Sequence, residues 1–139
     1  MTGMVFVDSN ILIYAHDVEA GIRRERSADR LRELWESRTG CLSTQVLQEF
    51  YVNVTQKIRT PLSPTAAREV LRNYAPWVRT LITPATVLRA SEISDTWHLS
   101  FRDSMIVAAA EQSEAEELLT EDLTHDQIVA GVRIVNPFR

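Results

Sequence analysis

The chain has 139 residues, of which 45% are hydrophobic and 24% are charged, and its net charge is −4. This size and composition, without any biased tract or internal repeat, predict one soluble globular domain that spans residues 1–139. The longest uninterrupted apolar run, residues 105–110, is too short to cross a bilayer, and the amino terminus lacks a signal-peptide pattern. We therefore expect a cytoplasmic protein without membrane contact.

The cysteine and charge content narrow the function only slightly. Cys41 is the only cysteine, so it cannot form an internal disulfide and is expected to be a small buried residue. A negative net charge argues against a nucleic-acid partner. If some of the acids hold metal ions, however, the ions neutralise them in the working protein, and the net charge then no longer opposes such a partner.

An apolar stretch near the amino terminus leads directly into polar residues. Residues 4–7 are all apolar, and Asp8, Ser9 and Asn10 follow them. Such a run is typical of a strand buried on both faces in a parallel sheet, and ligands bind at the carboxyl edge of such sheets. A simpler interpretation is that Asp8 or Ser9 only caps the helix that follows.

The rest of the chain alternates between helical and strand patterns. Helical spacing of apolar residues and capping residues predict helices over residues 11–16, 23–37, 44–58, 64–74, 85–97 and 100–112. Short apolar runs predict strands over residues 41–43, 78–82 and 132–135, and a further strand that ends at residue 119. Thr124 and Gln127 have the spacing of a capping box, so we also expect a last short helix that stops at Gly131. This alternation predicts an α/β fold with a mainly parallel sheet.

Four acids lie at the ends of these predicted elements. Asp8 follows the first strand, Glu49 lies early in the helix after the second strand, Asp103 opens a helix, and Asp122 follows the strand that ends at residue 119. Besides Asp8 as a helix cap, two of them have simpler explanations: a solvent-facing position for Glu49, and a capping box with Ser100 for Asp103. Because the carboxyl ends of parallel strands meet at one edge of a sheet, we expect the four acids to converge.

Converging carboxylates repel one another unless a positive charge lies among them. Lys57 is two helical turns beyond Glu49, and Arg102 is expected to reach only the edge of the cluster. We therefore expect Mg²⁺ or Mn²⁺, because oxygen ligands select hard cations and the chain has no Cys/His set for zinc. Two such ions would activate a water and stabilise the leaving oxygen of a phosphodiester. Asn10 and Thr120 are candidates to orient the water or the carboxylates.

Several short motifs occur in a fixed order along nearly the whole chain. They are VDSNIL at residues 7–12, STQVLQEF at 43–50, SFRDSMI at 100–106, LTEDL at 119–123 and GVRIVNPF at 131–138. Together they resemble the PIN-domain family, and the length of the chain resembles that of VapC-like toxins of type II toxin–antitoxin pairs. The ordered set is specific, whereas each motif alone is weak.

The resemblance implies a three-layer α/β/α sandwich and a Mg²⁺- or Mn²⁺-dependent endoribonuclease that hydrolyses RNA. It also implies a homodimer, and a small antitoxin protein whose tail covers the acidic site. Carried over by position, the catalytic and metal-binding residues would be Asp8, Glu49, Asp103 and Asp122, with Asn10 and Thr120 in support.

The chain departs from the family pattern in one motif and leaves a choice open in another. Phe101 and Arg102 precede Asp103, where such toxins often carry Trp or another apolar residue. This departure bears on contacts with RNA or with an antitoxin. Glu121 lies beside Asp122, and we prefer Asp122 as the fourth ligand.

Three other functions compete with the toxin hypothesis. A receiver-like signalling module also has an acidic Mg²⁺ pocket, but it needs paired acids after its first strand and a lysine after its last, and this chain has no lysine beyond Lys57. A catalytically silent PIN-like binding module conflicts with the presence of all four acids. A housekeeping RNA- or DNA-processing nuclease of the same fold agrees with the sequence as well, and a neighbouring gene for a small antitoxin would favour the toxin.

Overall fold

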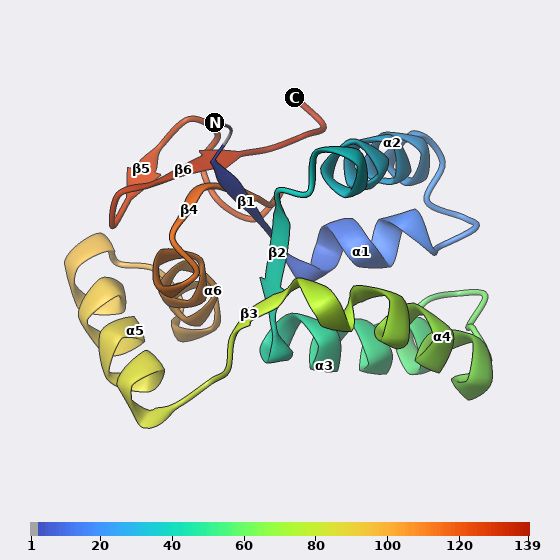
Figure 1. The fold of residues 1–139 in the computed structure, drawn as a ribbon, viewed down its shortest axis with the longest axis horizontal. Helices are drawn as coiled ribbons and strands as arrows, with labels where there is room; N and C mark the ends of the chain where they lie inside the picture. The colour runs from blue at the N-terminus through green and yellow to red at the C-terminus, as the bar shows by residue number, and fades with distance from the viewer. Residues whose placement is uncertain (1–2) are drawn as a thin grey trace.

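A computed structural model describes residues 3–139, and within them six strands form one sheet flanked by helices (Figure 1). The strands are β1 (Met4–Val7), β2 (Gly40–Ser43), β3 (Val78–Thr80), β4 (Ala115–Leu119), β5 (Ile128–Val129) and β6 (Val132–Val135). Their order is β3-β2-β1-β4-β6-β5, and every pairing is parallel except that of β5 with β6. The prediction of an α/β fold with a mainly parallel sheet is confirmed.

The helices form the two outer layers. They are α1 (Ser9–Ala15), α2 (Ile22–Ser37), α3 (Thr44–Val52), α4 (Pro64–Tyr74), α5 (Pro84–Trp97) and α6 (Phe101–Gln112), with the short turns η1 (Asn53–Lys57) and η2 (Ala75–Trp77). In Figure 1, α5 and α6 lie on one side of the strands, and α1 to α4 lie on the other. This arrangement is the expected three-layer α/β/α sandwich.

Polar residues at the helix starts explain where two of the helices begin. The Ser63 hydroxyl accepts a hydrogen bond from the backbone N–H three residues later, and Pro64 fills the first turn of α4. In the same way, the Ser100 hydroxyl accepts from the backbone N–H of Asp103 at 3.1 Å. Asp103 and its neighbour Arg102 are therefore held in the first turn of α6.

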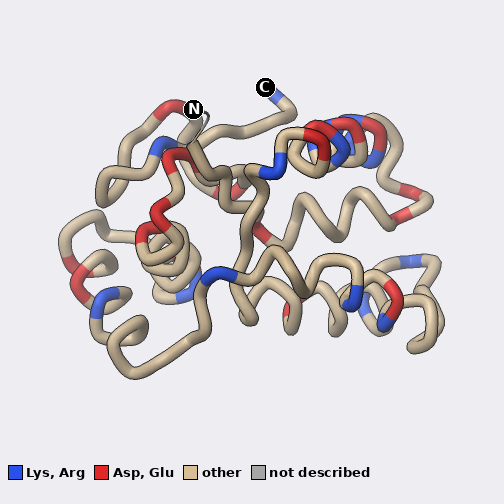
Figure 2. Tube along the Cα trace, viewed as in Figure 1, with Lys and Arg blue, Asp and Glu red and all other residues tan. Residues whose placement is uncertain are grey.

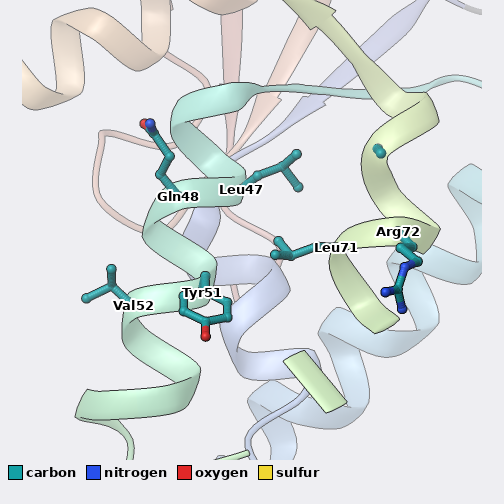
Figure 3. Close-up of a pocket in the computed structure, with 7 residues that line it drawn as sticks. Leu47, Gln48, Tyr51, Val52, Leu71 and Arg72 are labelled. Atoms are coloured by element: carbon teal, nitrogen blue, oxygen red, sulfur yellow. The ribbon is translucent and has the colours of Figure 1, made fainter. Parts of the chain in front are cut away.

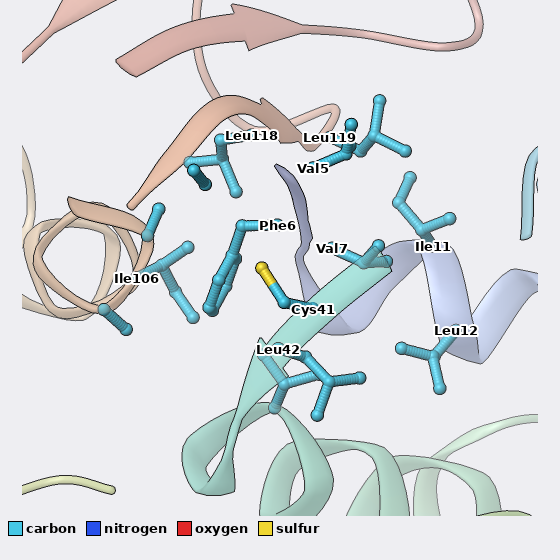
Figure 4. Close-up of a cluster of buried hydrophobic side chains, with 14 of the residues drawn as sticks. Val5, Phe6, Val7, Ile11, Leu12, Cys41, Leu42, Ile106, Leu118 and Leu119 are labelled. Atoms are coloured by element: carbon cyan, nitrogen blue, oxygen red, sulfur yellow. The ribbon is translucent and has the colours of Figure 1, made fainter. Parts of the chain in front are cut away.

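Strands β1 and β2 are buried on both faces along most of their length, and the carboxyl end of β4 is buried as well. The side chains of Phe6, Leu42 and Leu118 are fully buried, and Phe6 lies opposite Cys41 in β2 and Leu118 in β4. Ile106 of α6 covers one face of these strands (Figure 4). Cys41 is buried, as expected, and this burial raises the pKa of its thiol to about 11.

The helix predicted over residues 44–58 changes its character part-way. It ends as α3 at Val52 and continues as one π-helical turn, η1. The side-chain amide of Asn53 donates to the carbonyl of Glu49 at 2.8 Å, and the hydroxyl of Thr55 donates to that of Tyr51 at 2.6 Å. These bonds compete with the backbone bonds of the helix, which explains why the regular pattern ends there.

The prediction of a short helix after Thr124 is wrong, because this segment forms a β-hairpin. β5 pairs with β6 in antiparallel fashion, and the turn between them is Ala130 and Gly131, with φ of 50° and 82°. Two successive residues of positive φ are typical of a tight hairpin turn. The strand predicted over residues 78–82 is also shorter than expected and ends at Thr80.

The outer surface mixes both signs of charge. Figure 2 shows basic and acidic segments close together along α2, and Arg32 pairs with Asp29 while Arg30 pairs with Glu33. No helix within residues 3–139 is both long and apolar enough to span a membrane.

Candidate active site

The four candidate acids come from distant parts of the chain. Asp8 directly follows β1, and Asp122 lies in the loop after β4. Glu49 is in the second turn of α3, which follows β2 without a break, and Asp103 is in the first turn of α6. These positions all lie at or near the carboxyl edge of the parallel strands, where ligands bind in folds of this kind.

All four acids contact one guanidinium group, that of Arg102. Its Nη2 atom lies 2.7 Å from Asp8 Oδ1 and 2.5 Å from Glu49 Oε1. Its Nη1 atom lies 3.1 Å from Asp103 Oδ1 and 3.5 Å from Asp122 Oδ2. The four acids therefore meet in space, as the order of the elements predicts.

The expectation that Arg102 reaches only the edge of the cluster is wrong. The residue immediately precedes Asp103 in the first turn of α6, and its long side chain extends into the centre of the four carboxylates. The carboxylate charges stabilise it there, and charge-assisted hydrogen bonds to Asp8 and Glu49 hold the planar group in place. Part of the positive charge that the acids require is thus supplied by the chain itself.

Two other predicted residues support the acids. The Thr120 hydroxyl donates to Asp8 Oδ2 at 2.9 Å. The side-chain amide of Asn10 donates to Asp122 Oδ2 at 3.0 Å and to Thr120 Oγ1 at 3.3 Å. These hydrogen bonds connect β1, α1 and the loop after β4, so they fix the orientation of Asp8 and Asp122.

Ser9 also belongs to the cluster, although the sequence assigned its side chain no role beyond capping the following helix. Its hydroxyl donates to Glu49 Oε1 at 2.9 Å and accepts from Arg102 Nη2 at 2.9 Å. Asp8 does cap α1, since its Oδ1 accepts from the Ser9 N–H at 2.6 Å. Capping and membership of the cluster are therefore compatible, and the hydroxyl directly after Asp8 was the available signal.

Burial and ion pairing act in opposite directions on the site. Burial alone would raise the pKa of Glu49, but hydrogen bonds and charge from Arg102 outweigh it and hold that pKa below its ordinary value. Burial and the charges of Asp8 and Asp103 raise the pKa of Asp122, against the effect of Arg102. Burial alone would lower the pKa of Arg102, but the contacts with Glu49 and Asp8 outweigh it and raise that pKa above its usual value. The ionised form of Asp122 is thus disfavoured by neighbouring negative charges, whereas the ionised form of Glu49 is favoured by its pairing with Arg102.

These opposite shifts predict opposite effects of two amide variants on stability. The pairing of Glu49 stabilises the fold above its ordinary pKa of 4.5 and is lost as pH falls through the lower folded-state pKa. Glu49→Gln should therefore lower the Tm at neutral pH, and this difference should shrink in acid. Ionised Asp122 destabilises the fold at neutral pH, so Asp122→Asn should raise the Tm there, and the gain should vanish below its ordinary pKa of 3.8.

Melting curves of both variants and the parent chain, recorded without metal from acid to neutral pH, check this pair of predictions. Each change is expected to be about 1 kcal/mol or less, because both carboxylates are partly exposed to solvent. Shifts of the same sign in the two variants would contradict the proposed balance of charges.

A match to a known protein family identifies the family of this chain. The chain matches the family model of the PIN domain over residues 5–130, a range that includes all four acids. The chain belongs to the PIN-domain family. No curated protein matches it.

Solved structures with a similar fold cover almost the whole PIN domain. A toxin–antitoxin complex from Klebsiella pneumoniae has 20% identity and a TM-score of 0.68, with 96% of this chain and 97% of that chain covered. FitAcB from Neisseria gonorrhoeae has 18% identity and a TM-score of 0.65, with 97% and 99% covered. VapC20 from Mycobacterium tuberculosis, a sarcin–ricin loop cleaving toxin, has 20% identity and a TM-score of 0.57, with 93% and 98% covered. At such identities the similarity shows a shared fold.

In this PIN domain, Glu121 has partners outside the cluster. Its carboxylate accepts a hydrogen bond from the Tyr14 hydroxyl and pairs with Arg23 Nε at 3.0 Å. Burial and the Glu121 contact raise the pKa of Tyr14 to about 12. Asp122 instead contacts Asn10 and Arg102. These contacts favour Asp122 over Glu121 as the fourth acid of the cluster.

Among the described residues, two clefts border α3. A cleft of about 480 Å³ is lined by Glu49, Arg102 and Lys57, among others. A second cleft, of about 560 Å³, lies between α3 and α4 and is lined by apolar side chains that include Leu47 and Leu71 (Figure 3). Only the first of these two clefts is lined by one of the four candidate acids, Glu49, together with Arg102, so it is the candidate substrate groove.

The oxygen atoms of the site are of the kind that binds a hard divalent cation. In this structure, these atoms surround the guanidinium of Arg102. Carboxylate and amide oxygens are the ligands that such cations prefer. Asn10 Oδ1 is buried without a hydrogen-bond partner, so an acceptor remains open beside Asp122. Within residues 3–139, however, no three Asp, Glu, His or Cys side chains are gathered as a ready metal site. The oxygen atoms at the site are therefore ligands of the type that such an ion prefers. The distances between the carboxylates, however, are those that suit their contacts with Arg102.

Proposed function

We propose that this PIN domain is a Mg²⁺- or Mn²⁺-dependent endoribonuclease and the toxin of a VapBC-type toxin–antitoxin pair. The observation that carries the proposal is the meeting of four carboxylates at the carboxyl edge of the sheet, beside an open cleft. Such a cluster suits phosphodiester hydrolysis, because hard cations join carboxylates to phosphate oxygens. The toxin–antitoxin complex and the sarcin–ricin loop cleaving toxin among the structural neighbours support the same assignment.

In this proposal the acids hold the cation and their polar neighbours orient them. The ligands are Asp8, Glu49, Asp103 and Asp122. Thr120 and Asn10 donate to Asp8 and Asp122, which keeps these ligand atoms in place during the reaction. When bound, the cation supplies a hydroxide at neutral pH and stabilises the charge that develops on the leaving oxygen.

The substrate and the partners follow from the cleft and from the family. RNA would lie in the cleft beside α3, where the Lys57 ammonium is available to a backbone phosphate. We further propose that a small antitoxin protein covers the acids and that the chain forms a homodimer, as the resemblance to VapC-like toxins implies. Both partners would be encountered in the cytoplasm.

One observation favours a second candidate, a catalytically silent PIN module that binds RNA or protein. Arg102 already contacts all four acids, so the fold needs no metal ion to bring them together. A module of this kind would bind RNA in the cleft without cutting it. Cleavage of RNA distinguishes the two candidates.

The test is to incubate the purified chain with total RNA and to map the new ends by sequencing. With Mg²⁺ or Mn²⁺ we expect cuts at a small set of sites, because the cluster can then activate water. EDTA should reduce cleavage to background, and an excess of Mg²⁺ should restore it. Cleavage that is indifferent to EDTA would contradict the metal dependence, and RNA binding without cleavage in either metal would favour the silent module.

A further inference from the structure

Arg102 occupies the hydrogen-bonding positions of the most buried acid in the cluster. Asp8 Oδ1 accepts from the Ser9 N–H at 2.6 Å and from Arg102 Nη2 at 2.7 Å. Asp8 Oδ2 accepts from the Thr120 hydroxyl at 2.9 Å and from Arg102 Nη1 at 3.1 Å. A carboxylate oxygen offers about two lone-pair positions, so both oxygens of Asp8 are saturated.

Glu49 is saturated in the same way. Its Oε1 accepts from the Ser9 hydroxyl at 2.9 Å and from Arg102 Nη2 at 2.5 Å. Its Oε2 accepts from Arg102 Nε at 3.1 Å and from the Gln45 amide at 3.4 Å. Removing the guanidinium would therefore free one position on each of the four oxygens of Asp8 and Glu49.

A guanidinium and a divalent cation cannot use these positions together. Mg²⁺ binds oxygens at about 2.0–2.1 Å in a strict octahedral arrangement, which leaves no room for an N–H donor on the same lone pair. The two cations therefore exclude one another at Asp8 and Glu49. The cluster nevertheless attracts a second cation, because the single charge of Arg102 faces four negative charges.

Arg102 also has a path out of the cluster. Its side chain is 34% exposed, and it lines the cleft of about 480 Å³ beside α3. The backbone of α6 need not move for the side chain to rotate into that space, since Arg102 is in the first turn and only its side chain contacts the acids.

We propose that Arg102 is a built-in competitor of the divalent cation, which neutralises the acids in the metal-free protein and must leave the cluster before the ion is held. This inference rests on the proposed metal-dependent function and adds that the site is closed at low metal concentration. Metal binding is then coupled to the position of Arg102, and a variant without this charge binds the ion more tightly.

The test measures Mn²⁺ binding by isothermal titration calorimetry and by electron paramagnetic resonance of the free ion. Arg102→Gln is expected to bind Mn²⁺ about tenfold more tightly than the parent chain, within the range usual for coupled equilibria. Without metal, the same variant should melt at a lower temperature than the parent, because its acids are no longer neutralised. Mn²⁺ should then raise the Tm of the variant more than that of the parent.

Two further variants keep the test decisive. Arg102→Lys retains the charge, and so the fold, but cannot bond both carboxylates through a planar fork, so its Mn²⁺ affinity should be intermediate. Arg89→Gln is the matched control. The Arg89 side chain is 35% exposed and forms two hydrogen bonds, of 2.7 and 2.9 Å, with Glu111 rather than with the candidate acids. Its loss should leave Mn²⁺ affinity unchanged.

The outcomes separate this inference from the proposed function. Equal Mn²⁺ affinity in the parent chain and both Arg102 variants, or weaker affinity in Arg102→Gln, would overturn the competitor role and leave a metal-dependent nuclease intact. Absence of Mn²⁺ binding in every variant would overturn the metal dependence as well. Tighter binding in Arg102→Gln than in the parent chain, with Arg102→Lys between the two and Arg89→Gln equal to the parent, supports the competitor role.

Discussion

Asp8→Asn is expected to reduce RNA cleavage by about a hundredfold or more. Loss of a residue that merely orients a metal ligand typically reduces activity about 10- to 100-fold, and Asp8 is proposed as a ligand itself. Its side chain is only 2% exposed, and it is the single residue between β1 and α1. The amide also places an N–H₂ group where a carboxylate oxygen faces the cluster, which opposes any cation there.

The same variant should also be less stable, by about 1–3 kcal/mol, because Arg102 and Thr120 lose a charged partner. Repulsion among four acids alone would predict the reverse, so the sign of this change tests the role of Arg102 in the metal-free protein. Cleavage rates and thermal melts check both expectations. The control is Asp29→Asn, an exposed acid of α2 that pairs with Arg32, for which we expect parental activity and stability. Unchanged cleavage by Asp8→Asn would remove that residue from the site.

Phe50→Ala is expected to destabilise the fold by about 3–5 kcal/mol, the usual loss for a large aromatic side chain in a core. Phe50 is fully buried in α3, and its ring packs edge-on against His16, with centroids 5.6 Å apart. Because Glu49 directly precedes Phe50 on the chain, the cavity should also loosen the position of that acid.

Urea unfolding of Phe50→Ala measures this loss, and a second truncation calibrates it. Leu88 lies on α5 with 68% of its surface exposed, so Leu88→Ala should change stability by less than about 0.5 kcal/mol. Similar losses in the two variants would mean that Phe50 contributes little to the core. At a temperature where Phe50→Ala remains folded, its RNA cleavage should also be slower than that of Leu88→Ala.

Most of the fold follows from local signals in the sequence. The apolar run before Asp8 predicts a buried strand, and Ser63 with Pro64 predicts the first turn of α4, because these effects depend only on near neighbours. The meeting of the acids was also predictable, since parallel strands bring their carboxyl ends to one edge. None of these inferences needed the position of an individual side chain.

The remaining features depend on contacts between distant residues. The three-residue separation of Thr124 and Gln127 fits a capping box as well as the turn before β5. Only the pairing of β5 with β6 decides between the two. Arg102 belongs to a helix start that the sequence locates correctly. Whether its side chain points to solvent or into the cluster depends on where Asp8 and Glu49 lie in three dimensions.

The hairpin at the end of the chain has a consequence for how copies of this protein can associate. It places the two-residue strand β5 at one border of the sheet, while the three-residue β3 forms the other. Such short borders present few unpaired backbone groups, so they are poor templates for strand addition and for amyloid-like stacking. Any self-association of the folded chain is therefore favoured through its helical surfaces rather than by extending the sheet.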